Sequence, residues 1–187
     1  MLSVIIATLD CERALVPTLA ALVPGATAGL VSEVLLADAG SSDETAAVAD
    51  VAGCNFMVVK GPVGERLAAA AAAARAPWLL FLRPGTILDA PWIGEAGRFI
   101  ELGRRDDRAA VFRRSAPAQS GLRDAVSFLA SALWAKPHPG QGLIIAKVFY
   151  RQIGGHSARA ADAESDLLRR ISRRRITTLS TRTFQVG

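Results

Sequence analysis

The stretch that decides the fold is EVLLADAGSSDETAAVADVAG, residues 33–53. Its first part, EVLLAD, is a mostly apolar run that ends at Asp38, which is typical of a buried strand. Small turn residues follow, and residues 43–53 then have the composition of a helix, for which either Ser42 or Asp43 would be the N-cap. A buried strand that leads through a turn into a helix is the building unit of α/β proteins.

The same alternation continues on both sides of this stretch. Further strands are predicted at 3–8, 54–60 and 78–82, and helices are predicted at 12–25, where the leucines have helical spacing, and at the alanine-rich 64–76. The first helix is expected to end near Pro24 and Gly25. Strands that are apolar throughout and alternate with helices predict an α/β fold of three layers, with a mainly parallel central sheet.

The second half of the chain is less regular. We expect a helix from Pro91, a strand at 109–114, a helix at 121–136, a strand and a helix within 141–155, a helix within 162–175 and a strand at 176–181. The chain has 187 residues, with neither an internal repeat nor a long linker. This length suits one domain, 1–187, with halves at 1–97 and 98–187.

Composition excludes several classes of protein. Hydrophobic residues make up 51% of the chain, which excludes global disorder. No uninterrupted apolar run reaches the roughly 18–20 residues of a membrane span, and the N-terminus lacks the basic region of a signal peptide. The two cysteines are too few for a disulfide framework, and no Cys/His spacing is typical of zinc. We therefore expect a cytoplasmic protein.

Charge is distributed unevenly along the chain. Residues 1–97 carry 5 lysines and arginines against 10 aspartates and glutamates, whereas residues 98–187 carry 17 against 7. A basic second half is consistent with a solvated surface, an acidic ligand, an anionic membrane surface or nucleic acid. Few aromatic residues accompany the basic ones, which argues against single-stranded nucleic acid.

Polar residues gather where the predicted strands end. Thr8, Asp10 and Glu12 follow the first strand, and Asp38 ends the second, where it could either shape the turn or accept hydrogen bonds from a ribose or base. The fourth strand runs into a turn, Arg83-Pro84-Gly85, that has no carboxylate. Ligands of α/β sheets bind at the carboxyl ends of strands. The turn could therefore bind an anion with a metal, bind it without one, or bind nothing.

These motifs, in their order, resemble those of the family-2 glycosyltransferases over nearly the whole chain. EVLLADAGSSDET is similar to the family's E-[VI]-[IL]-V-V-D-[DG]-G-S-S-D-x-T, GQGLIIAKVFYRQIGG to its [DG]-Q-G-[IL]-F-[VI]-R segment, and AESDLLRRI to its E-D-x-[DE]-L segment. The fourth strand and the late STRTF are most similar to a small bacterial branch with the motif H-A-D-T. The resemblance implies the GT-A fold and transfer of a sugar from a nucleotide-diphosphate donor, usually a UDP-sugar.

The resemblance also implies roles for the matching residues. It assigns nucleotide binding to Thr8, Asp10, Glu12, Asp38 and Asp43 and the catalytic base to Glu164, and Gln141, Asp166 and Arg170 match motifs that we assign to the acceptor side. Arg66 and Arg83 are further candidates for nucleotide binding, and His138 is one for the acceptor side. A carboxylate base suits an inverting transfer, because it takes the proton of the acceptor hydroxyl as that oxygen attacks the anomeric carbon. The first half, 1–97, would then bind the nucleotide and the second, 98–187, the acceptor.

The chain departs from the family at the metal site. The metal-binding D-x-D falls on Arg83-Pro84-Gly85, so the turn offers no acidic ligand for Mn²⁺ or Mg²⁺. Three interpretations stay open. Arg83 could hold the diphosphate in place of a metal, since a guanidinium binds phosphate bidentately. A metal could use Asp38, Asp89 or His138. Alternatively, the chemistry is lost and the chain is a catalytically inactive nucleotide-sugar-binding or partner-binding protein.

The two histidines and the expected binding partners of the protein remain to be considered. His138, in KPHPGQG, could contact a phosphate or an acceptor, or could be an exposed loop residue. His156 stands where the family usually has Phe or Tyr, which makes it a candidate packing residue. The expected partners are a UDP-sugar, an unknown acceptor, an anionic membrane at its inner face and a second copy of the chain in a homodimer, with no nucleic acid.

Overall fold

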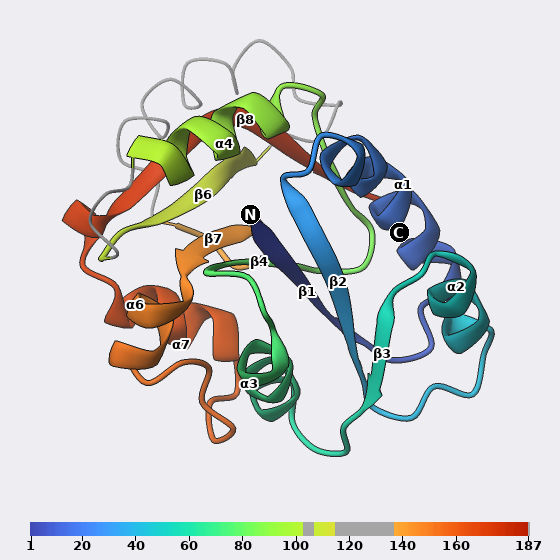
Figure 1. The fold of residues 1–187 in the computed structure, drawn as a ribbon. Coiled ribbons are helices and arrows are strands. Elements are labelled where there is room, and N and C mark those ends of the chain that lie inside the picture. Colours follow the sequence, from blue (N-terminus) through green and yellow to red (C-terminus); the bar gives the residue numbers. More distant parts are fainter. Residues whose placement is uncertain (103–106, 115–136, 187) are drawn as a thin grey trace, which may run out of the picture.

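The computed structural model describes residues 1–102, 107–114 and 137–186, which form an α/β structure (Figure 1). Eight strands make one sheet in the order β3-β2-β1-β4-β7-β6-β8-β5. The strands are β1 (Leu2–Thr8), β2 (Val31–Asp38), β3 (Asn55–Val58), β4 (Trp78–Leu82), β5 (Thr86–Leu88), β6 (Ala109–Arg114), β7 (Leu143–Ala146) and β8 (Ile176–Gln185). The helices are α1 (Glu12–Thr27), α2 (Thr45–Val51), α3 (Val63–Ala73), α4 (Trp92–Leu102), α6 (Lys147–Gln152), α7 (Ala163–Arg170) and the short 3-10 helix η1 (Arg173–Arg175).

The predicted parallel strands form one side of this sheet. β3, β2, β1 and β4 are parallel neighbours, with α1 and α2 on one face and α3 on the other (Figure 1). β4 is buried throughout and β1 almost throughout, as their apolar sequences predict for strands covered on both faces. The register places Thr8 beside Asp38, so the polar residues that end β1 and β2 are neighbours.

The second half of the chain extends the same sheet. β7 pairs antiparallel with β4 and with β6, whereas β8 is parallel to β6 and antiparallel to β5. The sheet is therefore mixed, with parallel pairs in the majority, which confirms the predicted fold class. The short strand β5 was not predicted, because it depends on pairing with β8 at the far end of the sequence. The helix predicted at 121–136 lies outside the described residues.

Helix α1 continues past the expected stop at Pro24 and Gly25 to Thr27. The glycine serves packing instead of ending the helix. A Cβ atom at Gly25 would lie 2.5 Å from the ring of Trp92 in α4, a tryptophan that is only 1% exposed. Gly25 therefore lets α4 pack closely against α1, which a sequence pattern cannot distinguish from a helix-stop signal.

Candidate functional site

A cleft of about 1220 Å³ opens at the carboxyl ends of β1 and β4. Its walls come from the ends of β1, β4, β6 and β8, from the start of α3, from residues 138–140 and from the N-terminus of α7. Its volume exceeds the roughly 300–1,000 Å³ of typical ligand pockets, so it can hold a ligand of several rings. The cleft lies at the sheet edge where α/β proteins bind ligands.

The turn after β4 is held rigidly at the edge of this cleft. Gly85 has φ of 85°, its amide donates to the carbonyl of Ala14 at 2.9 Å, and its carbonyl accepts from the amide of Val186 at 2.9 Å. A Cβ atom there would lie 2.2 Å from the carbonyl oxygen of Val186, so the turn requires glycine. These contacts fix the position from which Arg83 extends into the cleft.

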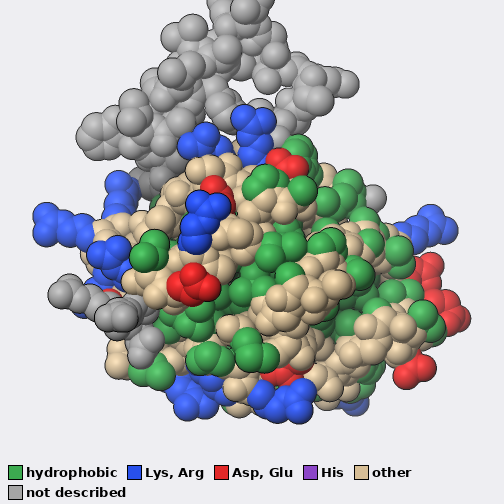
Figure 2. Space-filling model, turned by 45° about the horizontal axis from the view of Figure 1, so that its top comes forward, with side chains coloured by type: hydrophobic (Ala, Val, Ile, Leu, Met, Phe, Trp, Pro, Cys, Tyr) green, Lys and Arg blue, Asp and Glu red, His purple; other side chains and the backbone are tan. Residues whose placement is uncertain are grey.

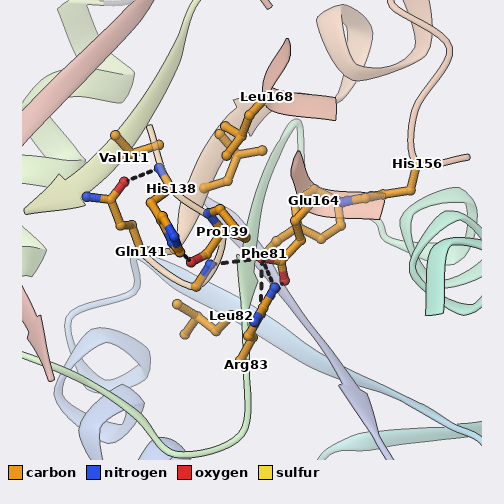
Figure 3. Close-up of a pocket in the computed structure, with 13 residues that line it drawn as sticks. Phe81, Leu82, Arg83, Val111, His138, Pro139, Gln141, His156, Glu164 and Leu168 are labelled. Carbon is orange, nitrogen blue, oxygen red and sulfur yellow. Dashed lines mark hydrogen bonds and ion pairs between the residues drawn. The ribbon is translucent and has the colours of Figure 1, made fainter. Parts of the chain in front are cut away.

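Arg83 and Glu164 form an ion pair across the cleft (Figure 3). Arg83 Nε donates to both carboxylate oxygens of Glu164, at 3.0 and 3.1 Å, and Nη2 lies 2.8 Å from Oε2. The amide of Gly140 also donates to Oε2 at 2.8 Å. Hydrogen bonding to Glu164 raises the pKa of Arg83, which keeps the guanidinium charged. The sequence thus identified two residues that meet, although it assigned them separate roles.

Asp38 is fully buried, and the chain itself uses its carboxylate. Oδ1 accepts from the hydroxyls of Thr8 and Ser41 at 2.8 and 2.6 Å, and Oδ2 accepts from the amides of Gly40 and Ser41 at 2.7 and 2.6 Å. Burial alone would raise the pKa of Asp38, but hydrogen bonds from Ser41, Thr8 and Gly40 outweigh it and hold that pKa below its usual range. The carboxylate therefore organises the turn after β2.

The other acidic residues of the first half join the loops that follow β1 and β2. Asp10 Oδ1 accepts from the amide of Ser42 at 2.7 Å. Asp43 Oδ2 accepts from the amide of Glu12 at 3.0 Å, and Glu12 Oε2 accepts from the amide of Glu44 at 3.0 Å. None of these three side chains, Asp10, Glu12 and Asp43, lines the cleft. The N-cap of α2 is Glu44, so the prediction of Ser42 or Asp43 for that position is wrong, although Asp43 accepts from the amide of Thr45 in the first turn.

Arg66 reaches the floor of the cleft from α3. It is 6% exposed, and Nη1 donates to the carbonyls of Thr8 at 2.7 Å and Ala37 at 3.0 Å. Among the described residues, Nε has no hydrogen-bond partner. Burial lowers the pKa of Arg66, and the negative charge of Asp38 opposes that effect. The cleft thus has a buried cation beneath the ends of β1 and β2.

The predicted acceptor-side residues separate into two groups. His138 and Gln141 line a small cavity beside the Arg83–Glu164 pair, where the amide of His138 donates to Gln141 Oε1 at 2.7 Å (Figure 3). Asp166 and Arg170 form an ion pair of 2.8 Å along α7, and Arg170 also donates to the carbonyls of Ile153 and Gly155. The second group fixes the loop after α6 and does not line the cleft.

His156 lies in the same small cavity, buried against Tyr150 and Phe81. Tyr150 Oη lies 3.0 Å from His156 Nδ1 and accepts from the amide of His156 at 2.9 Å. Burial, with the nearby charge of Arg170, lowers the pKa of His156 to about 4, although Asp166 acts in the opposite direction. The sequence indicated a packing residue here. Its one signal was a histidine at a position where the resemblance expects Phe or Tyr.

The buried histidine should make stability depend on pH. Because the unfolded state binds a proton near the ordinary histidine pKa of about 6.5, the unfolded state is favoured as pH falls from 6.5 toward 4. Between pH 7 and pH 5 the free energy of unfolding should fall by about 2 kcal/mol. Urea unfolding followed by fluorescence measures this change, and His156→Phe should remove most of it. An equal fall in the variant would contradict the assignment.

The described residues do not fit a resident metal ion. No group of three or more His, Cys, Asp or Glu within them is placed to hold one. Of the ligands considered from the sequence, Asp38 already accepts four hydrogen bonds, from Thr8 and from its own turn, Asp89 does not line the cleft, and His138 Nδ1 bonds the carbonyl of Pro139 at 2.8 Å. At the turn after β4 a guanidinium occupies the position where the resemblance expects acidic ligands.

Comparison with known proteins identifies the fold. The sequence matches no protein-family model, and no curated protein matches it significantly. Among solved structures, glucosyl-3-phosphoglycerate synthase from Mycobacterium tuberculosis, crystallised with Mn²⁺, UDP and glucosyl-3-phosphoglycerate, aligns over 100% of this chain and 72% of its own, with a TM-score of 0.73 and 18% identity. The chain has the GT-A fold.

A second glycosyltransferase structure supports the same GT-A assignment. S. aureus TarS, crystallised with UDP-GlcNAc, aligns over 100% of this chain with a TM-score of 0.73 and 17% identity. The GT-A chain described here covers 59% of the crystallised TarS chain, residues 1–349, so a substantial part of that chain has no counterpart. At this level of identity the comparisons establish the fold, and the activity has to be argued from the site.

Two surface properties bear on partners of this GT-A chain. No described helix is long and apolar enough to cross a membrane. On the face shown in Figure 2, lysine and arginine side chains are scattered, most of them toward the edge, and hydrophobic side chains occupy much of the centre. That face of the described residues therefore has no continuous basic patch.

Cys11 and Cys54 are both free thiols.

Proposed function

We propose that this protein is a glycosyltransferase that moves a sugar from a nucleotide-diphosphate donor, a UDP-sugar, to an acceptor hydroxyl without a resident metal. The observation that carries the proposal is the Arg83–Glu164 pair, which lies in an open cleft at the carboxyl end of β4. The GT-A fold supports it, as does the presence of UDP or a UDP-sugar in the two related structures.

Arg83 has the chemistry to hold the diphosphate. An arginine carries five N–H donors, and only Nε and Nη2 are used by Glu164 in the structure. The remaining donors can bind phosphate oxygens, and the fixed charge stabilises the negative charge that grows on the leaving diphosphate. Arg83 is 46% exposed at its side chain, so a ligand in the cleft can reach it.

Glu164 has the chemistry to act as the base. Oε1 accepts one hydrogen bond, from Arg83, whereas Oε2 takes the remaining contacts, so Oε1 keeps a lone pair for a substrate hydroxyl. In the proposed step the acceptor oxygen forms a bond to the anomeric carbon, and the bond from that carbon to the diphosphate oxygen breaks. The acceptor proton passes to Glu164.

The nucleoside would lie toward the ends of β1 and β2. Thr8 and Arg66 line that part of the cleft, and Arg66 Nε has no partner among the described residues, which suits contact with a base or ribose oxygen. We place Asp10, Glu12, Asp38 and Asp43 behind this surface, where they hold the loops that shape it. The basic second half favours an acidic or lipid-phosphate acceptor and docking on an anionic membrane.

A second candidate, a nucleotide-sugar-binding protein without turnover, is favoured by one observation. The carboxylate of Glu164 is already held by Arg83 and by the amide of Gly140, which would suit a structural ion pair as well as a base. The two candidates differ in whether donor binding is followed by loss of UDP.

UDP release tests the proposal. The protein is incubated in EDTA with UDP-glucose or UDP-GlcNAc, with water and mixed bacterial lipid-phosphate and sugar-phosphate acceptors, and UDP is quantified. Release above that of a protein-free control is the expected result. Binding of UDP-sugars without release would favour the second candidate, and the absence of both would overturn the proposal.

A further inference from the structure

A small cavity adjoins the cleft behind the Arg83–Glu164 pair (Figure 3). Its volume is about 20 Å³. Because a cavity needs roughly 10–15 Å³ to hold a water molecule, this one has room for a single water or hydroxyl oxygen. Arg83, Gly140 and Glu164 line both the cavity and the cleft, so a ligand in the cleft can extend one group into it.

His156 supplies a buried polar atom at this cavity. The residue is 5% exposed, and its ring lies edge-on to Phe81 with 4.7 Å between ring centroids. Its Nε2 is enclosed, and among the described residues it has no hydrogen-bond partner. A buried donor or acceptor without a partner is costly, so the cavity beside it is the place where a partner is expected.

The neighbouring tyrosine determines which ring nitrogen carries the proton. Tyr150 Oη accepts from the amide of His156, and among the described residues Nδ1 is the only acceptor within reach of the phenol proton, which is otherwise left without a partner. Burial raises the pKa of Tyr150 to about 12 and lowers the pKa of His156 to about 4, which keeps both groups neutral near pH 7. Nδ1 is then an acceptor, and the single ring proton resides on Nε2.

We propose that His156 and Glu164 form a subsite for one hydroxyl group of a carbohydrate ligand. His156 Nε2–H donates to the hydroxyl oxygen, and where that hydroxyl is the reacting one of the acceptor, its proton is the one that passes to Glu164 Oε1. The apolar remainder of the wall, from Phe81, Leu82, Val111, Leu143 and Leu168, favours a neutral group over a charged one. This inference rests on the proposed function and adds a binding residue to it.

The hydroxyl can belong to the donor sugar or to the acceptor, and calorimetry separates the two sources. If it belongs to the donor, His156→Phe weakens binding of UDP-glucose about 5-fold and leaves binding of UDP unchanged, because UDP has no sugar hydroxyl at that position. If it belongs to the acceptor, His156→Phe binds UDP-glucose and UDP as the unmodified protein does. The variant then needs about 5-fold more glycerol, used as a probe acceptor, to stimulate UDP release to the same extent. His156→Phe with neither effect overturns the proposal.

Two matched variants separate hydrogen bonding from packing. His156→Gln can place an amide N–H near the position of Nε2, so it should recover part of the loss seen in His156→Phe. Tyr150→Phe removes the hydroxyl that directs the ring proton to Nε2 and should reproduce part of that loss. Circular dichroism and thermal unfolding confirm that each variant is folded. A folded His156→Gln no better than His156→Phe would contradict the assigned donor.

An NMR measurement keeps this inference separate from the proposed function. In protein labelled with ¹⁵N at histidine, His156 should show a neutral ring protonated at Nε2, and glycerol or D-glucose should shift that signal. A proton on Nδ1, or no shift with glycerol, D-glucose or UDP-glucose, overturns the subsite. If UDP and UDP-glucose do not bind while D-glucose shifts the signal, the proposed donor is wrong and the hydroxyl subsite stands.

Discussion

Replacing Glu164 with glutamine is expected to lower UDP release by about 100-fold or more, because a neutral amide cannot take the proton of the acceptor hydroxyl. Binding of UDP should survive. Glu164 uses only some of the N–H donors of Arg83, and a neutral glutamine holds the guanidinium less strongly than a carboxylate does. Arg83 then keeps its donors available for the phosphates of UDP. The measurement is the rate of UDP release from UDP-glucose, together with the dissociation constant of UDP.

A glutamate on the surface provides the control for this substitution. Glu65 is exposed in the first turn of α3 and does not line the cleft, so Glu65→Gln makes the same chemical change away from the site. Its rate should match that of the unmodified protein. Unchanged turnover in Glu164→Gln would exclude Glu164 as the base. Loss of UDP binding in that variant would instead indicate that the ion pair only holds the cleft together.

Replacing Asp38 with alanine should cost about 4 kcal/mol of unfolding free energy, because buried donors lose their acceptor and a buried cation loses a compensating charge. The donors are the hydroxyls of Thr8 and Ser41 and the amides of Gly40 and Ser41, and the cation is Arg66. Urea denaturation at pH 7 measures the change. The size of the expected loss reflects the role of Asp38 as the organiser of the turn after β2.

Asp38→Asn is the matched control, since its amide oxygen can still accept the two bonds made to one carboxylate oxygen. It should lose about half as much stability as the alanine variant. If Asp38 served only to bind a nucleoside, both variants would unfold at the same urea concentration as the unmodified protein while losing affinity for UDP. That pattern would contradict the structural role assigned to this residue.

The local part of the fold was predictable from the sequence, and the long-range part was not. β1 to β4 were predicted because each is a mostly apolar run, and α3 because its alanines favour a closely packed helix. The expectation of strands buried on both faces is wrong for β3, which lies at the sheet edge and is exposed or half-buried. The antiparallel strand β7 in the middle of the sheet and the pairing of β5 with β8 depend on residues far apart in the sequence. The hydrophobic periodicity of a short stretch of sequence does not show which distant strand will pair with it.

In the candidate site, too, the sequence identified the important residues but not the residues that they contact. Sequence order located Arg83 and Glu164, but the contact between them spans 81 residues and appears only in the folded chain. Asp10 and Asp38 looked like candidates for ligand contact because carboxylates at strand ends often have that role. Asp10 Oδ1 instead accepts from Ser42, 32 residues away in the loop after β2. Asp38 accepts from Thr8, 30 residues away in β1, and from Gly40 and Ser41 in its own turn. His156 was assigned to packing because its partner, Tyr150, and its cavity are both products of the fold.

The central claim is that Arg83 binds a nucleotide diphosphate without a metal, and calorimetric titration with UDP tests it most directly. The titration is performed in EDTA and repeated with Mn²⁺, for the unmodified protein and for Arg83→Ala. The account predicts binding in EDTA that Mn²⁺ does not strengthen and that Arg83→Ala weakens by about 10-fold or more, as expected for loss of a charged hydrogen-bond donor. Binding that requires Mn²⁺, or binding that Arg83→Ala leaves unchanged, would contradict it.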